Sequence, residues 1–181
     1  MKKLLLHTCC GPCAIHVAQE LQKEHEVTLF FYNPNIFPEE EYFKRLNEVR
    51  IWSEKNNIDL IEGPYVHLNW LNKVAGLEEE AERGLRCPVC FNYRLVITAQ
   101  FAKQGGYDIF ATTLTVSPHK DAAAINKLGQ EIAEANDIKF YEADWKKNNG
   151  FVKSCELAER EGFYRQNYCG CEFSMKRVRA E

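Results

Sequence analysis

The sequence predicts an α/β protein, a three-layer sandwich in which helices cover both faces of a mostly parallel sheet. Strand-like and helix-like patterns alternate along its 181 residues, an arrangement that favours parallel strands joined by helices. The length fits one domain with a substantial core. Hydrophobic residues make up 45% and charged residues 27% of the chain, close to the averages of folded globular proteins.

Five short apolar runs predict the strands, because strands buried on both faces are apolar along their length. In chain order they cover residues 2–7, 27–32, 58–61, 107–112 and 139–143. The connections carry the helices, in which apolar residues recur three and four positions apart. Gly11 and Pro12 open the first helix, and Gly105 and Gly106 stop the fourth. In chain order the helices are expected over 11–25, over 39–55, around 70–74, and over 87–104, 121–136 and 150–162.

We expect one domain over residues 1–181, whose cysteine-bearing tail, residues 163–181, folds back onto the functional site. In parallel sheets that site lies beyond the carboxyl ends of the strands. The sequence has no apolar run of the ~18 residues that cross a bilayer, and no secretory pattern follows Met1. A cytoplasmic protein without a membrane partner is therefore expected.

Cysteine, with 8 residues, is unusually frequent for a compartment that keeps thiols reduced. Seven of the eight fall in three loop clusters, which favours metal binding or redox chemistry over a disulfide framework. The first two clusters open predicted helices, where backbone N–H groups stabilise thiolates. The clusters are Cys9-Cys10-x-x-Cys13, Cys87-x-x-Cys90 and Cys169-x-Cys171.

The number of cysteines in these clusters limits which metal centres they can hold. A tetrahedral zinc ion or a [4Fe-4S] cluster takes four thiolates, which leaves three for a second centre. A mononuclear metal with three protein ligands keeps an open position, as catalytic sites do. Cys155 is expected to be a core residue instead, since it shares an apolar helical face with Phe151 and Ala158.

Two other functions stay open on these residues alone. Cys10-Gly11-Pro12-Cys13 between a strand and a helix is typical of a thioredoxin-like dithiol oxidoreductase, although this function leaves the other two clusters unexplained. Two structural zinc sites would make the chain a non-catalytic zinc-binding module that binds RNA or protein. The identity of the metal distinguishes an iron–sulfur enzyme from such a module.

Five segments resemble the cobalamin-independent epoxyqueuosine reductases, the QueH family, and they occur in the order of that family over residues 6–171. The segment YRQNYCGC at 164–171 is the most specific of them. The others are LHTCCGPC at 6–13, FYNPNI at 31–36, CPVCF at 87–91 with Arg94 and Leu95, and TTL at 112–114 with Ser117 and Pro118.

The resemblance implies an adenine-nucleotide α-hydrolase-like (HUP-like) sandwich and the last step of queuosine biosynthesis. In that step the epoxide of epoxyqueuosine, at the wobble position of a tRNA, loses its oxygen. The resemblance also implies a [4Fe-4S] cluster beside a mononuclear iron, and no cobalamin. ATP use is not expected, because cysteines stand where a Gly-rich phosphate loop would follow the first strand.

The resemblance also implies roles for individual residues. The [4Fe-4S] cluster is expected on Cys10, Cys87, Cys90 and Cys169. The mononuclear iron, as the catalytic centre, is expected on Cys9, Cys13 and Cys171. Independently of the resemblance, Tyr32, Tyr168, His7 and His119 are candidate proton sources because each stands close in sequence to a cysteine loop or a predicted strand end, and water is an equal alternative. For His7 the other interpretation is a core histidine at the end of the first strand.

Binding of tRNA needs a local basic face, because the net charge of the chain is −3. Candidates for substrate binding are Asn33, Arg94, Ser117, Lys120, Arg165, Lys176 and Arg177. The expected basic face also includes Lys146, Lys147 and Arg179. Electrons are expected from an external ferredoxin- or flavodoxin-like donor.

Overall fold

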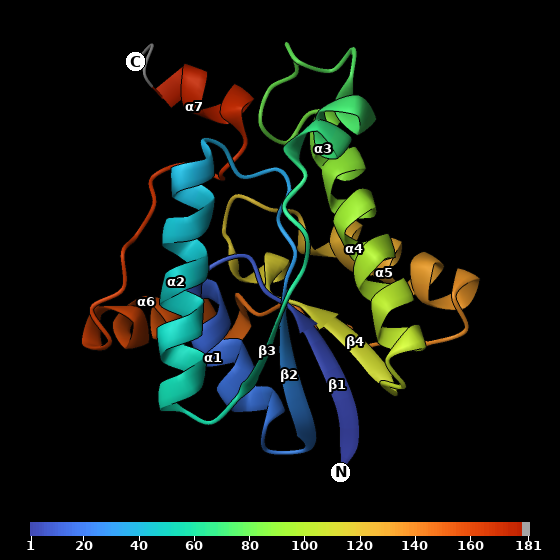
Figure 1. The fold of residues 1–181 in the computed structure, drawn as a ribbon, viewed down its shortest axis with the longest axis vertical. Coiled ribbons are helices and arrows are strands. Elements are labelled where there is room, and N and C mark those ends of the chain that lie inside the picture. The colour runs from blue at the N-terminus through green and yellow to red at the C-terminus, as the bar shows by residue number, and fades with distance from the viewer. Residues whose placement is uncertain (179–181) are drawn as a thin grey trace.

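The computed structural model describes residues 1–178, with the side chains of residues 1–175. Five strands form one sheet in the order β3-β2-β1-β4-β5, and all neighbouring strands are parallel (Figure 1). They are β1 (Lys2–His7), β2 (His25–Phe31), β3 (Asp59–Glu62), β4 (Ile109–Thr112) and β5 (Lys139–Phe140). The predicted fold class is confirmed, and the sheet is parallel throughout.

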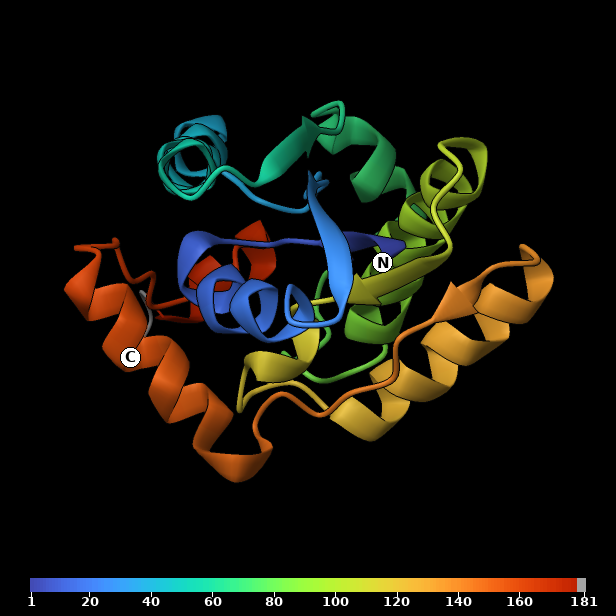
Figure 2. The same ribbon diagram turned by 90° about the horizontal axis from the view of Figure 1, so that it is seen from below.

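Helices cover both faces of this sheet and give three layers (Figure 2). They are α1 (Gly11–Leu21), α2 (Glu39–Lys55), α3 (His67–Val74), α4 (Arg86–Gln104), α5 (Ala122–Ala135), α6 (Gly150–Arg160) and α7 (Glu172–Val178). Two 3-10 turns, η1 (Leu114–Val116) and η2 (Lys147–Asn149), lie in the connections. Within residues 1–178, none of the helices combines the length and the apolar character that crossing a membrane requires.

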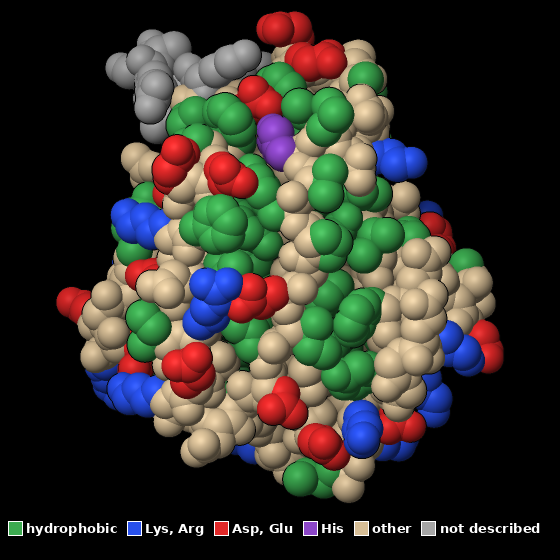
Figure 3. All heavy atoms as spheres, in the orientation of Figure 1, with side chains coloured by type: hydrophobic (Ala, Val, Ile, Leu, Met, Phe, Trp, Pro, Cys, Tyr) green, Lys and Arg blue, Asp and Glu red, His purple; other side chains and the backbone are tan. Residues whose placement is uncertain are grey.

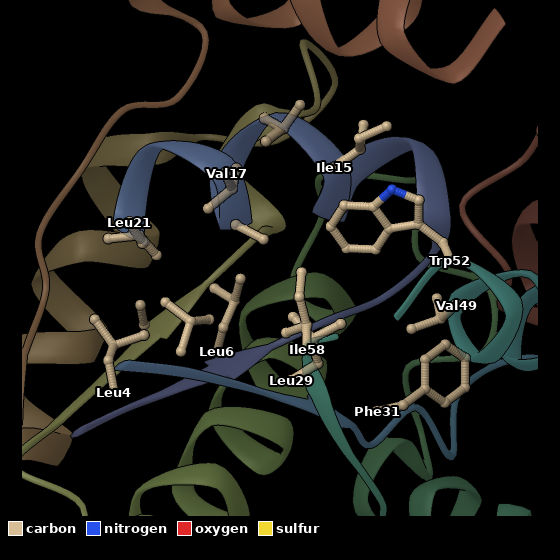
Figure 4. Close-up of a cluster of buried hydrophobic side chains, with 14 of the residues drawn as sticks. Leu4, Leu6, Ile15, Val17, Leu21, Leu29, Phe31, Val49, Trp52 and Ile58 are labelled. Carbon is tan, nitrogen blue, oxygen red and sulfur yellow. The ribbon is translucent and has the colours of Figure 1, made fainter. Parts of the chain in front are cut away.

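The core divides along the sheet because alternate side chains of a strand point to opposite faces. Leu4 and Leu6 of β1 pack with α1 and α2 through residues such as Ile15 and Trp52 (Figure 4). Leu5, between them, packs on the other face with α4 and α5. A third, smaller cluster joins α3, the start of α4 and the carboxyl-terminal tail.

The boundaries of some elements differ from those predicted. The first helix ends at Leu21 instead of near His25, because His25 begins β2 and pairs with Lys2 of β1. The last strand ends at Phe140, and α7 in the tail was not predicted. Asp121 begins α5 as expected, since its side chain accepts hydrogen bonds from two backbone N–H groups of the first turn.

The strand order determines where a ligand can bind. From the central strand β1 the chain turns to β2 on one side, while β4 lies on the other side. The loops after β1 and β4 therefore diverge and leave a crevice at the carboxyl ends of these strands. Cys9 and Cys10 lie in the first of these loops, and Thr113 begins the second.

Candidate metal centre

A cavity of about 1060 Å³ lies at these carboxyl ends. Its walls come from the starts of α1 and α4, the loop after β4, α5, α6 and the tail. Seven of the eight cysteines line it, and the eighth, Cys10, is buried with its sulfur 3.8 Å from the Cys9 sulfur. The fold therefore brings together all three cysteine clusters of the sequence.

Cys9, Cys10 and Cys13 form the first cysteine group, at the amino-terminal end of α1. Their three sulfur atoms all lie within 4.8 Å of one another. Hydrogen bonds from Cys10 and Cys13 hold the pKa of Cys9 well below its usual range, and the pKa of Cys13 is raised in turn. Thr113 also donates a hydrogen bond to the Cys9 sulfur, at 3.5 Å. Three thiols at this spacing are a donor set that could hold a metal ion.

We refer to Cys87, Cys90, Cys169 and Cys171 as the second cysteine group, because burial and, with it, the charge of Cys169 of the tail raise the pKa of both Cys87 and Cys90 in the first turn of α4. Cys90 and Cys171 are buried in one cluster with Trp70 of α3, and Cys169 packs against that cluster. A hydrogen bond from Cys171 holds the pKa of Cys169 well below its usual range. Among the described residues, only the first group brings three sulfurs within 4.8 Å of one another. The second group is therefore wider, and its four thiols match the ligand number of a [4Fe-4S] cluster.

Arg45 of α2 holds the tail that carries half of the second group. Its side chain is only 2% exposed and pairs with Glu41 at 2.7 Å. It also donates hydrogen bonds to the backbone oxygens of Cys169 at 3.3 Å and Tyr168 at 3.4 Å. Gly170 is required here, because its φ is +115° and a Cβ would lie 3.0 Å from Arg45 Nη1. Figure 1 shows the tail running beside α2 to reach α7.

The structure groups the cysteines differently from the predicted division between two centres. Cys10 lies with Cys9 and Cys13, because all three belong to one loop and the first turn of one helix. Cys171, expected beside those residues, instead packs in the cluster that contains Cys90. Relative to the predicted division, this grouping exchanges Cys10 and Cys171, and which cysteines ligate which centre stays a prediction.

Buried positive charge accompanies these thiols. Arg94 of α4 is 3% exposed, lines the cavity and donates to Asn33 Oδ1, while Asn33 Nδ2 donates to Thr8 O at 2.8 Å. Asn33 was predicted to bind substrate, but it does not line the cavity and instead orients Arg94. Burial alone would lower the pKa of Lys120, yet the surrounding cysteine sulfurs, Cys9 foremost, raise it.

Unpaired polar atoms gather around the same cavity. Buried polar atoms in folded proteins nearly always have hydrogen-bond partners, so an exception needs an explanation. Among the described residues, three buried side-chain oxygens without a partner belong to residues that line the cavity, namely Asn35 Oδ1, Ser154 Oγ and Gln166 Oε1. The side chains of Trp70 and Arg94, which also line it, form hydrogen bonds with the Cys90 sulfur. The cavity is therefore built for a polar occupant.

Four further predicted residues line the cavity, namely Tyr168, Ser117, Arg165 and His119. The Tyr168 hydroxyl donates to Phe37 O at 2.7 Å, and burial raises its pKa to about 12. Its proton is thus already engaged, which makes Tyr168 a positioning group in this structure. Arg165 and His119 are exposed at the mouth of the cavity.

Two candidate proton sources lie away from the cavity. Tyr32 is buried in the core beneath α4, stacks on Phe30, and has a pKa that burial raises above its usual range. His7 is completely buried, with Nδ1 2.9 Å from Thr112 Oγ1. Burial, followed by the charge of Arg94, lowers the pKa of His7 to about 3. His7 is therefore neutral and joins the ends of β1 and β4.

The expected basic face lies partly in the carboxyl-terminal tail and partly around η2. The side chains of Lys176 and Arg177 and all of Arg179 lie outside the described residues. Lys146 is engaged within the fold, because its Nζ donates to two backbone oxygens and pairs with Asp144 at 3.2 Å. Lys147 is exposed on η2.

Three residues differ from what the sequence suggested. Cys155 was expected in the core, but it is half-buried and lines the cavity, because the helical face that it shares borders the cavity. Arg45 was missed, since its partners in the tail are distant in sequence. Gln166 was also missed, although it lies inside the most specific segment of the resemblance, and its Nε2 donates to Cys10 Sγ at 3.2 Å.

Comparisons with known proteins identify a family of relatives for this chain. A sequence model of the family described as "Epoxyqueuosine reductase QueH" matches residues 4–177. The curated protein of that name from Streptococcus pyogenes is 40% identical over 179 residues, which cover 96% of this chain and 70% of the relative. The namesake from Acinetobacter baylyi is 39% identical over 176 residues, covering 96% and 81%. That from Thermotoga maritima is 33% identical over 178 residues, covering 97% and 91%.

A solved structure shares the fold. It is described as a predicted subunit of tRNA methyltransferase from Methanocaldococcus jannaschii, and it aligns with a TM-score of 0.57 at 11% identity. The alignment covers 87% of this chain and 76% of that one. At this identity the likeness concerns the α/β fold alone. The thioredoxin-like and zinc-module alternatives are not favoured by any of these comparisons.

Proposed function

This chain belongs to the epoxyqueuosine reductase QueH family, and from that premise we propose that it converts epoxyqueuosine in tRNA to queuosine. The reaction takes two electrons and two protons, breaks both C–O bonds of the epoxide, forms a C=C bond and releases water. The single observation that best supports it is the convergence of two cysteine groups on one polar cavity. A reductive site needs this combination of electron-carrying ligands and room for a substrate.

We propose that the second cysteine group holds a [4Fe-4S] cluster and that the first holds a mononuclear iron. The grouping supports this division, since Cys171 packs with Cys90 whereas Cys10 lies beside Cys9. When bound, such centres supply single electrons and a Lewis acid for the departing oxygen. No ATP and no cobalamin are required in this proposal, and the cysteines after β1 occupy the place of a phosphate-binding loop.

The residues of the chain give the cavity its charge and its shape. Arg94, held by Asn33, keeps a fixed positive charge beside the thiols and offsets negative charge that develops on a bound substrate. Lys120 faces the cysteine sulfurs and holds a proton at Nζ inside the cavity. Arg45 and Gly170 keep the tail closed over the site, so that residues 163–178 act with the rest of the chain as one domain.

We propose that tRNA approaches the cavity mouth. Arg83, Lys127 and Arg165 line the cavity and can neutralise phosphates, the contacts that dominate affinity for nucleic acids. Arg83 donates to the backbone oxygens of His119 and Pro118. Lys146, in contrast, also pairs with a carboxylate, so we expect the charge of Arg83 to act on a phosphate. On the face that Figure 3 shows, hydrophobic side chains gather between α2 and α4, with acidic and basic groups beside them. Changing the three cations together to Ala should flatten the dependence of tRNA affinity on salt by up to ~3 units. An unchanged slope would mean that the RNA lies elsewhere.

The test of the proposed function is turnover under anaerobic conditions. The iron-loaded protein is mixed with tRNA that carries epoxyqueuosine and with a strong one-electron reductant, in the absence of ATP and cobalamin. Mass spectrometry of the nucleosides should show queuosine, one oxygen atom lighter than the substrate. A reduced ferredoxin or flavodoxin then replaces the chemical reductant, as the proposed cytoplasmic electron donor. Absence of queuosine with fully iron-loaded protein would contradict the proposal.

A further inference from the structure

Gln166 of the tail touches the first cysteine group. Its Nε2 donates a hydrogen bond to Cys10 Sγ at 3.2 Å, while its Oε1 is buried and has no partner. The side chain also lines the cavity. One end of this amide thus contacts a cysteine sulfur, and the other end has an unused acceptor.

The hydrogen bond fixes the orientation of the amide. Its N–H points to the Cys10 sulfur, so its oxygen points away from that sulfur. A buried acceptor without a donor costs stability, so the structure favours an occupant of the cavity that supplies one.

Two other groups on the cavity wall have the same need. Asn35 is 3% exposed and its Oδ1 has no partner; Ser154 is 2% exposed and its Oγ has none. Both residues line the cavity with Gln166. The amide oxygens accept hydrogen bonds and a hydroxyl can also do so, so the matching ligand carries donors such as hydroxyl or ammonium groups. Epoxyqueuosine has both, in the hydroxyls of its cyclopentane ring and the amine that joins this ring to the base.

We propose that Gln166 is a positioning residue that connects the substrate ring to the first cysteine group. Its Nε2 donates to the Cys10 sulfur, and its Oε1 accepts from a hydroxyl or ammonium group of the substrate. Asn35 and Ser154 offer further acceptors to the modified nucleoside in the same cavity. This inference rests on the proposed function and adds the residues that recognise the modified part of the nucleoside.

The test compares two substitutions at one position. Gln166→Met keeps the size of the side chain and removes both hydrogen bonds, whereas Gln166→Glu keeps an acceptor and loses the N–H donor. The affinity is measured for tRNA with and without epoxyqueuosine at one salt concentration. The contribution of phosphate contacts then cancels in the ratio of the two affinities, which is the preference for the modified tRNA. Iron content and the reduction potential of the metal centres are measured on the same samples. Gln130→Met, on the surface of α5 where the amide contacts Glu142, is the matched control.

We expect Gln166→Met to reduce the preference for the modified tRNA about fivefold, the usual effect of one lost hydrogen bond. Gln166→Glu should keep the preference within about twofold. Both variants should lower the reduction potential, because an N–H donor to a ligating sulfur stabilises the reduced state. Gln130→Met should change neither quantity. If the Gln166→Met protein loses its iron, Gln166→Asn takes its place in the test. The shorter amide of Asn cannot reach both partners, so this variant should show the same loss of preference for the modified tRNA.

The failures of the two proposals are distinguishable. If the wild-type protein neither prefers nor converts tRNA with epoxyqueuosine, the proposed function is wrong. If the wild type does both and Gln166→Met keeps the full preference, only the role of Gln166 is wrong. An equal loss of preference in Gln166→Met and Gln166→Glu would also contradict it, since only one of them lacks an acceptor.

Discussion

The two cysteine groups reach the same cavity by different routes. The first comes from one short segment, residues 9–13, in which the end of β1 and the first turn of α1 fix the three sulfurs. The second joins the start of α4 to the tail and depends on Arg45 to hold that tail. A local motif thus determines its own geometry, whereas a site made from distant segments depends on the residues that anchor them. The second group should therefore be the more easily disrupted.

The largest effect is expected from Cys87→Ala. Removing one of four ligands from the second group should abolish the iron–sulfur absorbance and the turnover together, since the remaining three thiols do not complete a cluster. Absorbance spectra and sulfide analysis of anaerobically purified protein would measure this. A variant that kept its cluster would exclude Cys87 from the ligands.

Cys9→Ala tests the first cysteine group separately from the second. If the first group holds its own iron, this change should abolish turnover while most of the cluster absorbance remains. Cys155→Ser is the matched control, because Cys155 lines the same cavity but belongs to neither group. It should keep both metal content and turnover. Full turnover in Cys9→Ala would remove the need for two centres, and a reaction at one cluster would have to replace them.

Arg45→Met tests the dependence of the second group on its anchor. The substitution leaves Glu41 without its buried partner and frees two backbone oxygens of the tail, at a cost of about 3 kcal/mol in the free energy of unfolding. Iron bound by the second group should fall more than iron bound by the first. Arg50→Met on the same helix is the control, since the Arg50–Glu62 pair is 39% exposed on each side. It should cost less than about 1 kcal/mol and leave the metal content unchanged.

His7 offers a smaller test of the scaffold beneath the first group. Its pKa of about 3 in the folded protein lies below the value of about 6.5 in an unfolded chain. The unfolded state therefore binds more protons in between, so this contribution to stability is complete above pH 6.5 and is lost as the pH falls toward 3. In metal-free protein, His7→Gln should make the decline shallower by up to about 1.4 kcal/mol per pH unit. Equal slopes would show that His7 titrates alike in both states.

The same contrast between local and distant contacts explains what the sequence could predict. The alternating patterns predicted the α/β class, all five strands and the helices up to residue 160, because hydrophobic periodicity is a local property. The expectation that the three cysteine clusters meet came instead from ligand counting and from the tail folding back onto the site. Helix α7 was missed because the cysteine-bearing tail has too short a pattern to predict a helix.

The assignment of individual cysteines to the two groups could not be predicted from the sequence. Whether Cys10 or Cys171 joins a given group depends on how Arg45 and Gly170 turn the tail, which no local spacing encodes. Tyr32 was a candidate proton source because it stands near a strand end, but its side chain is buried in the core. His7 is buried as well, which agrees with the alternative of a core histidine at the end of a strand.

The central claim is that one cavity holds two metal centres, and counting iron and acid-labile sulfide in anaerobically purified, fully active protein tests it most directly. A [4Fe-4S] cluster with a separate iron predicts about five iron atoms and about four sulfides per chain. Cys9→Ala should remove about one iron and no sulfide. Four iron atoms in fully active wild-type protein, or zinc in place of iron, would contradict the account.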